Sequence, residues 1–138
     1  MTRRKHNILI LEDDIFWLAT LKILLRYLPY TITTSSNGQD GLQYLTDDQS
    51  TISLVLSNIN MPGLDGLEFL SIIKEDPKLM NIPVILQSAA TVEEAQKGLA
   101  LGADLFLRKP YGATDLYVAL AQVSQKMIEY ERSIRQVV

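Results

Sequence analysis

The stretch SLVLSNINMPGLDGLEFL, residues 53–70, decides the fold that this sequence predicts. Its apolar run has the length and composition of a buried strand, and the run ends at Asn58. A loop with proline and glycine follows, after which apolar residues recur at helical spacing. Asp65 and Glu68 stand three residues apart, as in a capping box that starts a helix. The stretch therefore predicts a buried strand, a tight loop and an amphipathic helix, with a polar residue at the end of the strand.

Composition limits the class of protein. The chain has 138 residues, of which 47% are hydrophobic and 21% charged, and this is typical of one globular domain. A formal net charge of −3 gives no excess of cations for phosphate contacts, so direct nucleic-acid binding is not expected. The absence of cysteine excludes disulfides, thiolate chemistry and cysteine zinc sites.

The start of the chain, MTRRKHNILILEDD, has a basic cluster followed by a short apolar run. Glu12 and Asp13 stop that run before it reaches the length of a signal peptide or a membrane span. We therefore expect a cytoplasmic protein without a membrane segment. The basic cluster at residues 3–6, which includes the only histidine, His6, is interpreted as a solvated tail ahead of the first strand.

Four further segments have strand-like composition: residues 7–11, 31–36, 84–87 and 105–108. Several of these runs do not alternate apolar and polar residues, which is typical of strands that are covered on both faces. Helical patterns separate the five strands, so the fold class predicted is α/β, a doubly wound five-stranded parallel sheet. In such a sheet the functional site lies beyond the carboxyl ends of the strands.

The residues at that edge have complementary chemistry. The predicted strand ends place Glu12 and Asp13, Asn58, Ser88 and Lys109 there. Two adjacent acids repel each other unless a cation such as Mg²⁺ lies between them. A solvated helix N-terminus, where Asp13 or Asp14 meets the helix dipole, would also explain the acids. A lysine and a hydroxyl beside such a cation would suit the oxygens of a phosphoryl group.

These motifs resemble, in order and spacing, the receiver domain of bacterial two-component response regulators. The resemblance rests on ILILEDD at 8–14, LVLSNINMPGLDG at 54–66, VILQSAA at 84–90 and GADLFLRKPY at 102–111. It implies a flavodoxin-like (βα)5 fold with strand order 2-1-3-4-5 and a receiver domain over residues 1–125. It also implies a signal-transduction module, not an enzyme, that accepts a phosphoryl group from a sensor histidine kinase or phosphotransfer protein.

The resemblance assigns a role to each site residue. The Mg²⁺ ligands would be Glu12, Asp13, residue 58 and the backbone carbonyl of Asn60. Ser88 and Lys109 would contact the phosphoryl group, and Phe106 takes the position of the switch aromatic, without the hydroxyl of a tyrosine.

The phospho-acceptor aspartate of the family falls on Asn58. Attack on a phosphohistidine needs an anionic oxygen, which an amide does not supply, so this chain should not be phosphorylated there. The loss of one negative ligand should also weaken Mg²⁺ binding. Either the amide was introduced to block phosphorylation, or the chain is a natural variant. The alternative function is a phosphate-independent receiver-like interaction module; a phosphatase or a flavin protein on the same topology fits the motifs less well.

The C-terminal segment, residues 126–138, is expected to extend the last helix beyond the domain. Apolar residues continue there at alternating steps of four and three, the spacing of a coiled-coil seam, and include Met127, Tyr130 and Ile134. The segment could form a dimerising helix, a linker to an output domain or a frayed tail. One residue has no role in this scheme: Gln87 is polar within an otherwise apolar strand.

Overall fold

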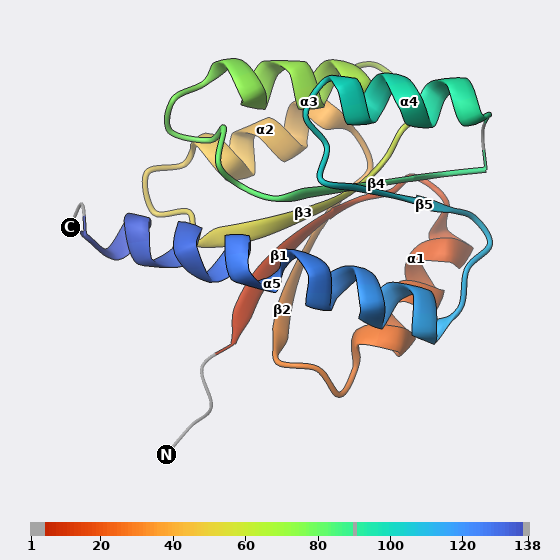
Figure 1. The fold of residues 1–138 in the computed structure, drawn as a ribbon, viewed down its shortest axis with the longest axis horizontal. Coiled ribbons are helices and arrows are strands. Elements are labelled where there is room, and N and C mark those ends of the chain that lie inside the picture. The colour runs from red at the N-terminus through yellow and green to blue at the C-terminus, as the bar shows by residue number, and fades with distance from the viewer. Residues whose placement is uncertain (1–4, 90, 137–138) are drawn as a thin grey trace.

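The computed structural model describes residues 5–89 and 91–136 (Figure 1). Five strands alternate with five helices in these ranges. The strands are β1 (His6–Leu11), β2 (Tyr30–Ser35), β3 (Ile52–Asn58), β4 (Val84–Ser88) and β5 (Leu105–Arg108). The helices are α1 (Ile15–Leu25), α2 (Gly38–Thr46), α3 (Gly66–Glu75), α4 (Val92–Ala100) and α5 (Ala113–Gln136). None of the helices in the described ranges is long and apolar enough to cross a membrane.

All five strands form one parallel sheet with the order β2-β1-β3-β4-β5. Helices α1 and α5 cover one face of the sheet, and α2, α3 and α4 cover the other (Figure 1). The predicted fold class and strand order are therefore confirmed. Because all strands run in the same direction, their carboxyl ends meet at one edge, where the site was expected.

Local sequence signals explain where the helices begin. The Asp65 side chain accepts from the backbone N–H of Glu68, and the Glu68 side chain accepts from that of Asp65, so the predicted capping box forms at α3. Asp14 caps α1 through the N–H groups of Phe16 and Trp17. The alternative explanation of the acids, a helix N-terminus at Asp13 or Asp14, is therefore confirmed for Asp14.

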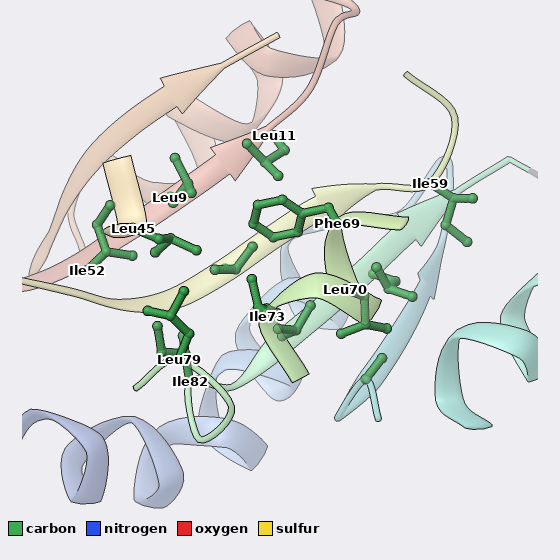
Figure 2. Packing of buried hydrophobic residues seen from close by; sticks show 14 of the residues in the cluster. Leu9, Leu11, Leu45, Ile52, Ile59, Phe69, Leu70, Ile73, Leu79 and Ile82 are labelled. Carbon is green, nitrogen blue, oxygen red and sulfur yellow. The ribbon is translucent and has the colours of Figure 1, made fainter. Parts of the chain in front are cut away.

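The pleat of the strands divides the core into two clusters. Residues such as Leu9 and Leu11 of β1 point toward α2 and α3, where Phe69, Leu70 and Ile73 are fully buried (Figure 2). The other cluster lies between the sheet and helices α1 and α5; it includes Ile8, Ile10, Leu21, Ile85, Leu116 and Met127. The apolar run at residues 8–11 of β1 is needed because both faces of the strand are covered there.

The C-terminal half of α5 stays in contact with the domain. Met127 is 1% exposed, and Tyr130 packs against the first cluster and donates its hydroxyl to the carbonyl of Lys78. Glu131 accepts from His6 Nδ1 at 2.7 Å and from Ser53 Oγ at 2.8 Å. His6 therefore belongs to β1 and not to a solvated tail, while residues 3 and 4 lie outside the described ranges. A domain boundary at residue 125 stays a prediction.

Candidate functional site

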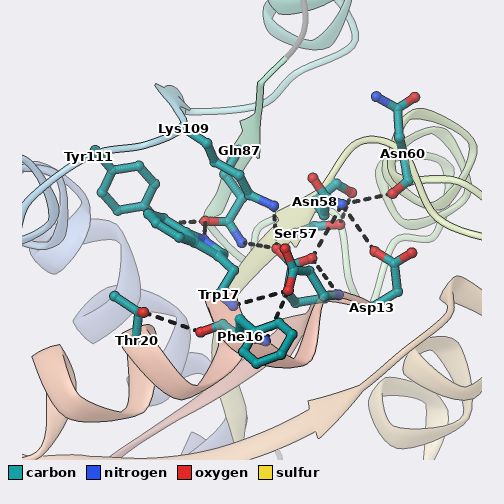
Figure 3. Close-up of polar contacts among 12 residues, drawn as sticks. Asp13, Phe16, Trp17, Thr20, Ser57, Asn58, Asn60, Gln87, Lys109 and Tyr111 are labelled. Atoms are coloured by element: carbon teal, nitrogen blue, oxygen red, sulfur yellow. Dashed lines mark hydrogen bonds and ion pairs between the residues drawn. The ribbon is translucent and has the colours of Figure 1, made fainter.

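Four segments that are far apart in the sequence meet at the carboxyl edge of the sheet (Figure 3). Glu12 and Asp13 follow β1, Asn58 ends β3, Ser88 ends β4, and Lys109 follows β5. The structure thus brings together the residues that the sequence placed at this edge. The parallel register of β1, β3, β4 and β5 is what aligns their ends.

Glu12 is the most deeply buried acid of this edge, with 3% of its surface exposed. One of its carboxylate oxygens, Oε1, accepts from Lys109 Nζ at 2.5 Å and from Gln87 Nε2 at 3.1 Å. The other, Oε2, accepts from the backbone N–H of Asp14 at 3.0 Å. A buried carboxylate is tolerated only with such partners, because an unpaired buried charge is costly. Glu12 is therefore held in place from several sides.

Asn58 is a hydrogen-bond donor at this edge through its amide nitrogen, whereas Glu12 is an acceptor. Nδ2 donates to the backbone carbonyl of Asn60 at 2.7 Å, and it lies 3.3 Å from an Asp13 oxygen and 3.4 Å from Glu12 Oε2 (Figure 3). All three neighbours are acceptors, so the nitrogen and not the oxygen of the amide must face them. The amide group thereby bridges both acids and the loop after β3.

The loop after β3 packs closely against the end of that strand. A Cβ atom on Gly66 would lie 2.1 Å from the backbone carbonyl oxygen of Asn58, and the N–H of Gly66 donates to the carbonyl of Ile59 at 2.7 Å. Only glycine allows α3 to begin at this distance from the strand. The glycine in the quoted stretch thus fixes the backbone on which Asn58 and Asn60 stand.

The oxygen atoms around Asn58 are of the kind that Mg²⁺ prefers, namely two carboxylates and a carbonyl. In the present arrangement they do not fit the ion, because the donor nitrogen of Asn58 faces all three of them. No group of three or more histidine, cysteine, aspartate or glutamate side chains that could bind a metal occurs in residues 5–89 and 91–136. A cation would require the amide to turn its oxygen inward.

Ser88 and Phe106 lie where the sequence placed them. Ser88 is 2% exposed at the end of β4, and its backbone carbonyl accepts from the N–H of Lys109 at 2.9 Å. Phe106 is half-buried in β5 and packs against the cluster on the α2–α3–α4 face. Their roles in contacting a phosphoryl group and in switching stay predictions.

Three residues of this edge were missed as site residues by the sequence reasoning. The carboxamide oxygen of Gln87 accepts from Trp17 Nε1 at 3.1 Å and from the hydroxyl of Tyr111. The rings of Trp17 and Tyr111 meet edge to face at 4.9 Å, and Lys109 Nζ lies 5.6 Å from the Trp17 ring. Burial raises the pKa of Tyr111 well above its usual value, and the charge of Glu12 adds to the effect, whereas the hydrogen-bonding contact with Trp17 opposes it. The available signal was the polar Gln87 in an apolar strand.

The response regulator receiver domain family matches residues 8–121 of the chain. The chain belongs to this family. Receiver domains are signalling modules of two-component systems, not catalytic enzymes, and they generally partner with histidine kinases. The predicted family is thereby confirmed.

Similar proteins include long plant regulators. The receiver is 36% identical over 115 residues to the two-component response regulator-like PRR37 of Oryza sativa subsp. japonica, with 83% of the chain and 16% of PRR37 covered. It is 28% identical over 129 residues to the two-component response regulator ARR11 of Arabidopsis thaliana, with 93% and 24% covered. The chain therefore spans a quarter or less of these relatives.

A solved structure shares the fold. The receiver domain of sensor histidine kinase PA1611 from Pseudomonas aeruginosa PAO1, which holds a magnesium ion in its active site cleft, superposes with a TM-score of 0.77. The two are 22% identical, and the match covers 86% of this chain and 96% of that one. At this identity the likeness concerns the fold alone.

Proposed function

We propose that this receiver works in two-component signalling while residue 58, at the phospho-acceptor position, stays unphosphorylated. The observation that carries the proposal is the hydrogen bonding of Asn58, whose amide donates toward Glu12, Asp13 and the carbonyl of Asn60. An acceptor residue would need a free anionic oxygen at this place. Asn58 instead supplies N–H donors, so it hydrogen-bonds to the two acids from within the protein.

The same contacts support the proposal that Mg²⁺ binds this site only weakly. In a receiver with aspartate at residue 58, three carboxylates would meet at this edge and would need a cation to offset their repulsion. With Asn58, the hydrogen-bond donors of the amide partly take over that task, and Lys109 already holds Glu12. We therefore assign Glu12, Asp13, the side-chain oxygen of Asn58 and the carbonyl of Asn60 as a weakened Mg²⁺ site, which requires the amide to turn its oxygen inward. Ser88 and Lys109 are the proposed phosphoryl contacts of a chain with aspartate at residue 58.

The partners follow from the family. A sensor histidine kinase or a phosphotransfer protein is the proposed partner, since receivers generally act with histidine kinases. Because the chain covers a quarter or less of relatives such as PRR37 and ARR11, an output domain or a separate target protein would convert the signal. A homodimer through the end of α5 is also proposed. Because Met127 is buried within the domain, the dimer contact is limited to residues after it.

A second candidate function is a phosphate-independent interaction module. The same network favours it, because the carboxylate of Glu12 and the amide of Asn58 already have hydrogen-bonding partners within the protein. A pocket that is stable in this way could present one fixed conformation to a partner. The two candidate functions differ in whether an aspartate at residue 58 restores phosphorylation.

Intact mass after incubation with Mg²⁺ and acetyl phosphate or phosphoramidate tests the proposal. The variant Asn58→Asp should gain one phosphoryl group, and the unaltered chain should gain none. Asn60→Asp is a matched control, because it adds the same charge two residues away on an exposed side chain. Calorimetric titration with Mg²⁺ should show tighter binding to Asn58→Asp than to the unaltered chain.

Each outcome has a distinct meaning. Phosphorylation of Asn58→Asp alone would support a working phosphoryl site that the amide blocks. No addition on either form would favour the phosphate-independent module. Stable phosphorylation of the unaltered chain within residues 12–14 or 58–60, located by fragmentation, would overturn the proposal.

A further inference from the structure

Gln87 is a fully buried amide in a strand whose preceding residues are all apolar. Val84, Ile85, Leu86 and Gln87 each have 0% of their surface exposed. A buried carboxamide that lacked partners would destabilise the fold, because its polar atoms would lose their hydrogen bonds to water without replacement. Gln87 has partners for both of its polar atoms, and these hydrogen bonds offset the cost of burying the amide.

The contacts of Gln87 join two parts of the molecule. Its nitrogen donates to Glu12 Oε1, which belongs to the acidic edge. Its oxygen accepts from Trp17 of α1 and from Tyr111 of the connection between β5 and α5 (Figure 3). Because the Trp17 indole can only donate and the Glu12 carboxylate can only accept, the orientation of the amide group is fixed, and the Tyr111 hydroxyl acts as a donor to its oxygen.

Glu12 extends the connection to residue 58. Its Oε2 faces the amide of Asn58 at 3.4 Å, and its Oε1 faces Gln87 and Lys109. The two oxygens belong to one rigid group, so a carboxylate that turns in response to residue 58 also changes the bond to Gln87. Chains of packed, hydrogen-bonded side chains of this kind can transmit an energetic coupling between sites.

The direction of this connection differs from the one that the resemblance implies. There, the signal would pass through Ser88 and Phe106 and reshape the face formed by α4, β5 and α5. Phe106 packs on the α2–α3–α4 face. Gln87 lies on the other side of β4, the same side as Ile85, which packs on the α1–α5 face with Trp17 and Tyr111. Phe106 also has no hydroxyl with which to form a hydrogen bond.

We propose that Gln87 is a positioning residue that couples the charge at residue 58 to Trp17 and Tyr111, so that the state of the acidic edge is transmitted to the α1–α5 face. The inference rests on the proposed function, since it takes the edge around Asn58 as the signalling site. It adds the face at which the signal leaves the domain and the side chain that carries it.

The single tryptophan of the chain makes the coupling measurable. In a ¹H–¹⁵N correlation spectrum the indole N–H of Trp17 gives one resonance, and this N–H is the group that bonds to Gln87. The change Asn58→Asp, without Mg²⁺ or phosphodonor, should shift that resonance. The control Asn81→Asp should shift it much less, because the Asn81 side chain is exposed and lies outside the network.

Variants at Gln87 and at Phe106 then identify the side chain that transmits the coupling. In a Gln87→Met background the shift caused by Asn58→Asp should fall to about half or less, as expected for residues that act through one another. In a Phe106→Leu background it should persist. Any remainder in Gln87→Met measures the second path, from Lys109 to the Trp17 ring. A shift of undiminished size in Gln87→Met, or its loss in Phe106→Leu, would overturn the proposal.

A second measurement decides the question if Gln87→Met does not fold. In the chain with Gln87 intact, the carboxamide resonances of Gln87 should move together with the indole resonance when Asn58→Asp is introduced. An indole that moves while the carboxamide does not would exclude Gln87 as the carrier. Since no phosphodonor is used, a failure of phosphorylation and a failure of the coupling are separate results.

Discussion

The two faces of the sheet reach the same functional edge with different chemistry. On the α2–α3–α4 face the core continues to the edge with Ile59, Met61 and Phe69, all apolar and buried. On the α1–α5 face the last side chain of β4 is Gln87, which hydrogen-bonds to Trp17 and Tyr111. Neighbouring residues of one strand therefore serve two purposes: one face supplies packing, and the other links the acidic edge to the helices.

The largest effect is expected from opening the apolar face. Phe69 is fully buried among the residues of the first cluster (Figure 2), so Phe69→Ala should lower the free energy of unfolding by about 3–5 kcal/mol. Urea unfolding followed by circular dichroism measures the loss. The matched control is Phe16→Ala, since Phe16 is 80% exposed and should change the stability by about 0.5 kcal/mol or less. Equal effects of the two changes would contradict the assignment of the core.

The next effect compares adjacent residues of β4 that point to opposite faces. Gln87→Met removes the acceptor of Trp17 and Tyr111 and should cost about 1–3 kcal/mol in total, because both donors are only partly buried. Leu86→Met conserves volume in the apolar cluster and should cost less than about 1.5 kcal/mol. The same urea titration ranks both variants. A smaller loss for Gln87→Met than for Leu86→Met would mean that the buried hydrogen bonds contribute little.

The apolar pattern of the strands was enough to predict the fold and its edge. Runs such as ILIL and LVL specify buried parallel strands, and the strand ends bring Glu12, Asn58 and Lys109 together without further information. The orientation of the Asn58 amide could not be predicted, because it depends on the positions of acceptors from three segments. The partners of Gln87 were missed for the same reason: Trp17 and Tyr111 are distant in sequence.

The long α5 helix shows another limit of sequence patterns. Its apolar spacing past residue 125 is the same for a coiled-coil seam and for a helix packed on its own domain. The structure buries Met127 on the sheet and pairs Glu131 with His6 and Ser53. The partners come from the starts of β1 and β3, which no local pattern around residue 131 indicates.

The next change tests this extension of the α1–α5 face. Glu131→Ala removes the acceptor of His6 and Ser53 and should cost about 1–2 kcal/mol, less than a fully buried network because these groups are partly exposed. Glu129→Ala, on the same helix, is the control. The Glu129 side chain is exposed and, within the described residues, accepts a hydrogen bond only from Gln125, which is exposed as well. Thermal unfolding of both variants should give a lower midpoint for Glu131→Ala. Identical midpoints would show that the end of α5 does not stabilise the domain.

The smallest effect concerns the hydroxyl of Tyr111 and appears most clearly at alkaline pH. Burial raises the pKa of Tyr111 above the ordinary value of 10.0, with a further contribution from Glu12, so the folded protein favours the protonated phenol. The stabilisation that this preference supplies is fully present below pH 10.0 and is lost as the pH rises above that value toward the folded-state pKa. At neutral pH, Tyr111→Phe should cost about 0.5–1.5 kcal/mol for the bond to Gln87. Between about pH 9 and about pH 11 its stability should fall less steeply than that of the unaltered chain, because one buried phenol no longer ionises on unfolding.

Tyr30 and Tyr130 also have raised pKa values through burial, with smaller contributions from Glu131 and Asp76 respectively, so the slope should diminish and not vanish. Urea unfolding across this range measures both curves, and parallel curves would mean that the Tyr111 hydroxyl is as free to ionise in the folded protein as in the unfolded chain.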